Sequence, residues 1–181
     1  MRARLAEPRF RAVFGRIQKQ VVEQVRNEWS GFSRLDLTQP SDAAILEHFR
    51  GDEGRNIRWG VASLTAVLDE DRELADLMRK TIVNYARIIL GARRRALDGK
   101  LDAKESPELA RRLALWTHDR FDVGVSWSFG AAGFALSYDV LYDSMSEGER
   151  ATVRHAIATA TSGRKSYGNG MARGYASSNH Y

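Results

Sequence analysis

Apolar residues recur at helical spacing along most of this chain, beginning close to its start. Between residues 8 and 29 they fall on one stripe, and Pro8 stands near the beginning of the pattern, where a helix tolerates proline. The stripe consists of Val13, Phe14, Ile17, Val21 and Val25. The pattern predicts an amphipathic helix over residues 8–29, followed by a linker with the sequence "GFSRLDLTQP".

Three more helices are predicted before the polar stretch "DGKLDAKES". The first begins at Ser41, a good N-cap residue, and ends at Gly51, while the others cover residues 57–69 and 72–97. In the helix predicted over residues 57–69, the apolar residues at helical spacing are Ile57, Val61, Leu64 and Leu68. In the helix predicted over residues 72–97, they are Leu74, Leu77, Met78, Ile82, Tyr85 and Ile89. Pro107 then opens a further predicted helix over residues 107–118.

The least polar segment of the chain is "VGVSWSFGAAGFALSYDVLYDSM". Its 16 uncharged residues, 123–138, are too few to cross a bilayer and include serines, so we expect no membrane insertion. The segment predicts a buried helix over residues 123–143. Gly124, Gly130 and Gly133 would weaken an isolated helix, and we expect them to let neighbouring helices approach closely.

A capping box follows, with Ser146 three residues before Glu149. It predicts a helix that runs to about Ser162 and ends at Gly163. The inward positions of this helix are Val153, Ala156, Ile157 and Ala160. Because a helix that is apolar on all sides must be enclosed by others, we expect residues 123–143 to be more buried than residues 146–162.

No segment shows the alternation typical of a β-strand, so the predicted fold class is all-α. A nearly all-apolar helix joined by a tight turn to a one-faced helix is the pattern expected of two layers of antiparallel helical hairpins. With 181 residues, 43% hydrophobic and 28% charged, the chain is long enough for one soluble globular domain. The absence of cysteine excludes disulfides and thiolate chemistry.

The net charge of +5 comes mostly from arginine, which recognises carboxylate, sulfate and phosphate groups well. Solvated helix faces explain this charge more simply than a field that attracts an anionic ligand, and both interpretations stay open. The run "GARRRALDGK" lacks interleaved aromatic residues, so no nucleic-acid partner is expected. His48, His118 and His155 fall on separate predicted helices without ligand spacing, so no metal site and no cofactor are expected in this region.

The segment "WSFGAAGFALSYDVLYDSMSEGERATVRHAI", followed by a glycine-rich loop that closes in "SSNHY", resembles the helical domain of the heparinase II/III-like polysaccharide lyases and the related alginate lyases. The resemblance implies an incomplete (α/α) toroid of antiparallel helical hairpins. It also implies that residues 1–181 are the N-terminal part of this domain, with the rest of the toroid and a β-sandwich domain beyond them. Such a fragment is expected to be inactive by itself.

The same resemblance implies an acidic polysaccharide or oligosaccharide as substrate and a periplasmic or secreted location for the full-length enzyme. The first residues, "MRARLAEPRF", are not followed by an apolar stretch, so this chain shows no signal peptide.

The chemistry of such a lyase can be stated from the residues themselves. Cleavage of a uronate polymer by β-elimination removes the proton on C5 and expels the glycosidic oxygen on C4, so the enzyme must offset the carboxylate charge and supply a base and an acid. Asn179 can donate from its amide to the carboxylate, and His180 titrates near neutral pH. The resemblance assigns these roles to the pair and implies a catalytic tyrosine further along than Tyr181.

Four residues of the glycine-rich loop are candidates for sugar stacking and anion contact, because loops carry ligands more often than cores do. They are Tyr167, Arg173, Tyr175 and Tyr181. Trp127, Tyr138 and Tyr142 are interpreted instead as core aromatic residues, because they lie on the most apolar predicted helix.

Two other function classes remain open. A toroid glycoside hydrolase would need two carboxylates across a cleft. Asp139 and Asp143 are two such carboxylates, and their spacing of four residues places them on the same face of the predicted helix. Buried hydrogen bonding or capping is the favoured interpretation of these two aspartates. A non-catalytic helical scaffold or glycan-binding module is the third class, and it would leave His180 dispensable.

Overall fold

The computed structural model describes residues 7–48, 56–97 and 125–161. They form helices α2 (Pro8–Ser33), α3 (Asp42–His48), α4 (Asn56–Leu68), α5 (Arg72–Leu97), α7 (Val125–Leu141) and α8 (Glu147–Thr161), with the 3₁₀ turn η2 (Tyr142–Ser144) between the last two. These ranges contain no strand, which confirms the all-α prediction for them. No helix among them is both long enough and apolar enough to cross a membrane.

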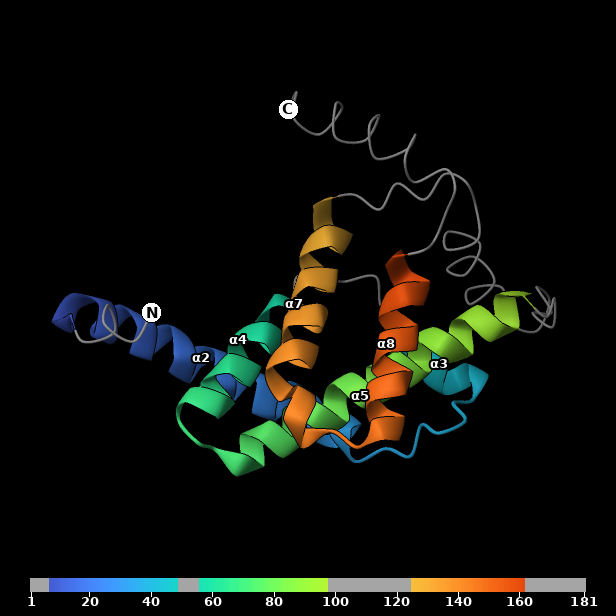
Figure 1. The fold of residues 1–181 in the computed structure, drawn as a ribbon, viewed down its shortest axis with the longest axis horizontal. Coiled ribbons are helices and arrows are strands. Elements are labelled where there is room, and N and C mark those ends of the chain that lie inside the picture. The colour runs from blue at the N-terminus through green and yellow to red at the C-terminus, as the bar shows by residue number, and fades with distance from the viewer. Residues whose placement is uncertain (1–6, 49–55, 98–124, 162–181) are drawn as a thin grey trace, which may run out of the picture.

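The α5 helix is the centre of the fold. It packs against α2, α3, α4, α7 and α8, and its buried residues run almost without interruption from Thr81 to Ala86. Figure 1 shows α5 in green, running beneath the upright α7 and α8. The predicted limits of this helix, residues 72–97, are those observed.

The antiparallel pair α7 and α8 follows the expected pattern. In Figure 1 the two helices lie next to each other in orange and red, with the turn η2 at their lower ends. Within the described residues α7 is more buried than α8, as predicted. The capping box also forms, because Ser146 N donates to Glu149 Oε2 at 2.8 Å and Glu149 N donates to Ser146 Oγ at 3.3 Å.

The α4–α5 hairpin has a tight turn at residues 69–71. Glu70 adopts a left-handed conformation with φ of 56°, and Asp71 N donates to Ala66 O at 2.9 Å, which closes the end of α4. Asp71 Oδ1 then accepts from Leu74 N at 2.9 Å and caps α5. Its other oxygen accepts from Arg26 Nη2 of α2 at 2.8 Å, so one aspartate joins three helices.

Glycine permits the close approach of α4 and α7, which form the most extensive helix pair. A Cβ atom placed on Gly60 would lie 2.9 Å from Leu136 Cδ2 and 3.5 Å from Gly133 Cα. The expectation for Gly133 is therefore confirmed. Gly124 lies outside the described residues, and the surroundings of Gly130 are not described.

An aromatic cluster fills the space between α2, α4, α5 and α7. The ring of Trp59 is fully buried and lies 4.8 Å from Trp29, 5.0 Å from Tyr85 and 6.4 Å from Phe134, measured between centroids. The first two contacts are edge-to-face, an arrangement that aromatic pairs favour.

Two predictions about α2 are wrong. The helix continues to Ser33 instead of giving way to a linker at Gly31, because Phe32 and Ser33 are buried against the fold. Val13 and Ile17 are 52% and 47% exposed, although they belong to the predicted apolar stripe. Figure 1 gives the reason, since the N-terminal part of α2 extends past the other described helices.

The apolar residues at helical spacing in α4 are not its most buried residues. Val61, Leu64 and Leu68 are only half-buried, whereas the fully buried positions carry Trp59 and smaller side chains. Those smaller side chains are Ala62, Ser63, Thr65 and Ala66. The helix has α2 and α5 on one side and α7 on another, so its enclosed face is wider and is rotated toward the small residues.

Candidate functional site

The candidate catalytic and substrate-binding residues lie outside the described part of the chain. Asn179 and His180, together with Tyr167, Arg173, Tyr175 and Tyr181, belong to residues 162–181. The structure therefore leaves these predictions untested. The segment that leads to them, from Gly133 to Ala158, is described with its side chains.

In that segment Tyr142 is a surface residue and not the expected core aromatic. It is 37% exposed, and the guanidinium carbon of Arg150 lies 4.2 Å above its ring centroid. Arg150 Nε also donates to Tyr142 O at 3.0 Å. The α-helix ends at Leu141, so Tyr142 begins the 3₁₀ turn and its side chain no longer follows the buried stripe of α7.

Tyr138 fits the core interpretation better. It is half-buried, packs against the main core and lies edge-to-face with Tyr142 at 5.6 Å. Its buried hydroxyl has no hydrogen-bond partner among the described residues, which is uncommon for a buried tyrosine. The side chain of Trp127, the third aromatic of this group, is not described.

The expectation that Asp139 and Asp143 are buried is wrong. Both side chains are exposed. The cap of the following helix comes from Ser146, and the turn itself is closed by Ser144 Oγ, which donates to Leu141 O at 2.6 Å. The physical reason is that position 139 falls on the outer side of α7, and position 143 falls in η2.

The two described histidines are packing or surface residues, as expected. His48 lies 4.8 Å from the ring of Phe32 and within 3.8 Å of a Glu47 oxygen, while His155 is exposed. Across residues 7–48, 56–97 and 125–161, no three His, Asp or Glu side chains lie close enough together to hold a metal ion.

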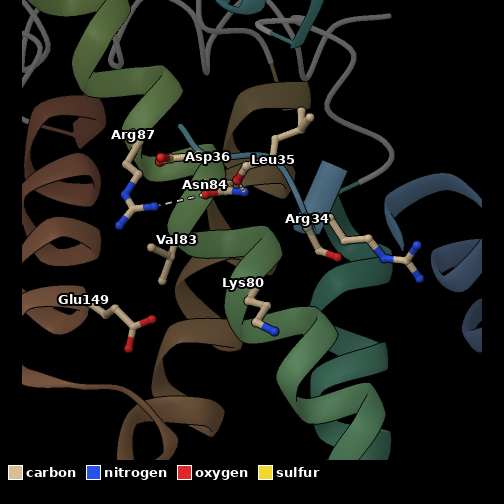
Figure 2. Close-up of a pocket in the computed structure, with 9 residues that line it drawn as sticks. Arg34, Leu35, Asp36, Lys80, Val83, Asn84, Arg87 and Glu149 are labelled. Atoms are coloured by element: carbon tan, nitrogen blue, oxygen red, sulfur yellow. Dashed lines mark hydrogen bonds between the residues drawn. The ribbon is translucent and has the colours of Figure 1, made fainter. Parts of the chain in front are cut away.

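No pattern in the sequence indicates the small pocket that lies between the end of α2, α5 and the start of α8. Figure 2 shows it with its lining side chains, and its volume is about 230 Å³. Its polar lining comprises Ser33, Arg34, Asp36, Lys80, Asn84, Arg87 and Glu149. These residues come from three parts of the chain, so no local motif could have indicated the pocket.

Asn84 organises this pocket. The residue is 4% exposed, and its amide nitrogen donates to Phe32 O at 3.0 Å and to Leu35 O at 2.9 Å. Both bonds hold the chain that leaves α2 against α5. The amide oxygen accepts from Arg87 Nη1 at 3.2 Å, which Figure 2 marks as a dashed line. Both the amide nitrogen and the amide oxygen of this buried asparagine therefore have hydrogen-bond partners, as buried polar groups usually do.

Both carboxylates of the pocket have a pKa below the ordinary value. Hydrogen bonds from the Thr38 hydroxyl and backbone N–H lower the pKa of Asp36, and the charge of Arg87 adds to them. Burial of Glu149 acts to raise its pKa, but hydrogen bonds from Ser146 and the positive charges of Arg79 and Arg87 together outweigh it. Both groups therefore stay ionised at neutral pH.

In comparisons with known proteins, no family model, no curated protein and no solved structure matches this chain.

Proposed function

We propose that this chain is part of a polysaccharide lyase that cleaves an acidic, uronate-containing glycan by β-elimination. Asn179 donates its amide hydrogens to the substrate carboxylate and offsets its charge. His180 acts as the base or stabilises the charge that develops at C5, and a tyrosine serves the leaving oxygen. Tyr167, Arg173, Tyr175 and Tyr181 hold the sugar chain. A periplasmic or secreted location belongs to the same proposal.

The observation that carries the proposal is the sequence from 127 to 181, with "YDVLYDSMSEGER" leading to "SSNHY". The described part of this segment supports the proposal. Its apolar helix α7 and one-faced helix α8 form an antiparallel hairpin with the expected capping box. An (α/α) toroid built from such hairpins is the architecture that we propose for the whole helical domain.

Hydrolysis is the less favoured chemistry. A glycoside hydrolase uses one carboxyl group as acid and another as base or nucleophile, on opposite sides of the scissile bond. Asp139 lies on the outer side of α7 and Asp143 lies in η2, and both stand exposed on one hairpin. Two exposed aspartates on one hairpin do not place carboxyl groups on opposite sides of a bound sugar, so this pair does not favour hydrolysis.

The test uses the protein expressed from its complete reading frame, with uronate-containing polysaccharides as substrates. Asn179→Ala and His180→Ala should each remove most of the release of unsaturated uronate ends, measured by ultraviolet absorbance. One positioned acid–base group contributes about 10²- to 10⁴-fold, so the His180 effect should fall in that range. Far-ultraviolet circular dichroism should show unchanged helix content.

Each alternative has its own outcome. Product ends without the double bond would replace elimination by hydrolysis. Near-normal turnover by the His180→Ala variant would remove this residue from the mechanism. Glycan binding without any cleavage by the complete protein would favour the non-catalytic binding module.

A further inference from the structure

Among the described residues, Arg87 lines the α2–α5–α8 pocket without an ion pair, as does the exposed Arg34. The guanidinium of Arg87 has five N–H donors, and the bond that positions it goes to a neutral acceptor, Asn84 Oδ1, at 3.2 Å. Within the described ranges, no carboxylate lies at ion-pair distance from Arg87, whereas neighbouring Arg79 and Lys80 both have acidic partners. The guanidinium is thus oriented but not neutralised by direct contact.

The carboxylates that could have paired with Arg87 are engaged elsewhere. Asp36 accepts from Thr38 N at 3.1 Å and from Thr38 Oγ1 at 2.8 Å, within its own turn. Glu149 accepts from Ser146 N at 2.8 Å and pairs with Arg79. These bonds leave a place for another anion beside Arg87.

The position of Arg87 is set before any ligand arrives. Asn84 is buried and gives both amide hydrogens to backbone carbonyls, so its oxygen has to point toward Arg87. A guanidinium that is held in this way loses less side-chain entropy on binding than a free surface arginine. Its planar fork matches the two oxygens of a carboxylate.

The charge around the pocket selects an anion with one negative charge. Its lining includes three basic residues, Arg34, Lys80 and Arg87, and two acidic ones, Asp36 and Glu149, which leaves one positive charge in excess. One carboxylate neutralises this excess. A sulfate or phosphate dianion would bring a second negative charge close to two ionised carboxylates that repel it.

Size limits the ligand as well. The volume of about 230 Å³ is smaller than the roughly 300–1,000 Å³ of sites that enclose drug-sized molecules. Arg34 is exposed, and in Figure 2 its guanidinium extends away from Arg87, so it contributes attraction at the rim and not a direct contact. The pocket can therefore hold one carboxylate with few attached atoms.

We infer that this pocket is a binding site for the carboxylate group of a small organic acid, with Arg87 as its anchor. The carboxylate can belong to a free small acid or to one sugar residue. This site is separate in sequence from Asn179 and His180, and its occupation does not depend on whether the chain cleaves glycans.

The experiment is a titration of the full chain, labelled with nitrogen-15, followed by nuclear magnetic resonance. Lactate and glucuronate are the two carboxylate probes, and lactamide is the uncharged counterpart of lactate. We expect both carboxylates, or one of them, to shift the signals of the Asn84 amide and the Arg87 guanidinium, and lactamide to leave them in place. Lactate alone would indicate a free small acid, and glucuronate alone a sugar acid.

Three variants separate the anchor from general charge. Arg87→Gln should weaken carboxylate binding by about tenfold or more, the amount expected when a hydrogen bond to a charged group is lost. Arg87→Lys keeps the charge without the planar fork, so its carboxylate affinity should lie between that of Arg87→Gln and that of the native chain. Arg16→Gln removes the same charge from an exposed site on α2 and should change the affinity by less than about twofold.

Sulfate supplies the final comparison. Tighter binding of sulfate than of either carboxylate, at equal ionic strength, would overturn the charge argument. Equal binding by the native chain and the folded Arg87→Gln variant, or no response of Asn84 and Arg87 to either carboxylate, would overturn the site itself.

Discussion

Gly91 stands where α5 meets the segment that leads into α3, and replacing it with alanine should destabilise the fold. A Cβ atom on residue 91 would lie 2.7 Å from Pro40 Cγ and 3.2 Å from Ile45 Cδ1. A separation of 2.7 Å between carbon atoms is far below the roughly 3.5–4.0 Å of an optimal contact. Either α5, α3 or the ring of Pro40 must therefore move.

The neighbours of Gly91 cannot move without further cost. Pro40 is buried, its ring is rigid, and its carbonyl accepts from Arg95 Nη2 at 2.7 Å. Arg95 also pairs with Asp42 in the first turn of α3. Moving Pro40 away from α5 would strain both contacts. The steric overlap should therefore not be relieved by a shift of Pro40, and its cost should lower the free energy of unfolding.

The magnitude follows from two opposing effects. Overpacking of this kind costs about 1–3 kcal/mol. Alanine in a helix interior is better than glycine by about 0.5–1 kcal/mol. The expected net loss for Gly91→Ala is therefore about 0–2.5 kcal/mol in the free energy of unfolding.

Gly15→Ala is the matched control, because the same change in α2 meets open space. Apart from its chain neighbours and the backbone of its own helix, no atom of the described residues lies within 4 Å of the Cβ position at residue 15. Only the gain in helix propensity remains, so this variant should be more stable than the native chain by about 0.5–1 kcal/mol. Gly60→Ala should fall between the two, since its overlap is with the end of the Leu136 side chain, which is 44% exposed and free to turn.

Urea unfolding followed by far-ultraviolet circular dichroism measures all three variants. A slope of about 2 kcal/mol per molar places the midpoints of Gly15→Ala and Gly91→Ala about 0.3–1.8 M apart. If Gly91→Ala were as stable as Gly15→Ala, the close contact between α5 and Pro40 would not exist as described.

Glu149 should make stability depend on pH: its pKa in the fold is below its ordinary value of 4.5, so its stabilisation is present above that pH and disappears as pH falls through the lower folded value. Glu149→Gln should lower the free energy of unfolding by about 1 kcal/mol at neutral pH. In urea titrations its stability should decline less steeply than that of the native chain as pH falls below 4.5, whereas an unchanged decline would contradict the role of the carboxylate. Glu70→Gly should raise the urea midpoint, because glycine accepts the φ of 56° without the roughly 1 kcal/mol penalty of other residues, and a lower midpoint would show that the Glu70 side chain compensates for this strain. In the complete protein, Arg173→Ala should weaken glycan binding more at low than at high ionic strength if it meets an anionic chain, and a loss independent of salt would assign it another role.

The local parts of the fold were readable from the sequence because their causes lie within a few residues. The pair Ser146 and Glu149 satisfies the free N–H groups of its own helix end, and Ser41 Oγ accepts from Ala44 N at 3.2 Å in the same way. The limits of α5 are predicted from the stretch over which apolar residues recur about once in each helical turn. Such features do not depend on what the helices later contact.

The choice of buried face needed the tertiary structure. Val13 and Ile17 follow the helical period but stay exposed, because the N-terminal part of α2 extends past the other described helices. Trp59 and Asn84 are buried because partners distant in sequence enclose them, among them Trp29 and the carbonyl of Phe32. Periodicity states that a helix has an apolar side, but not how many neighbours share it.

The candidate sites also fall into those indicated by adjacent residues and those formed by tertiary packing. The sequence by itself indicated an all-α chain, the helix starts and the Asn179–His180 pair, since each rests on adjacent residues. Only the tertiary structure brought Asp36, Arg87 and Glu149 to one pocket and placed Tyr142 on the surface. Charges 50 or more residues apart act together only after packing has brought them within a few ångströms, where their attraction becomes significant.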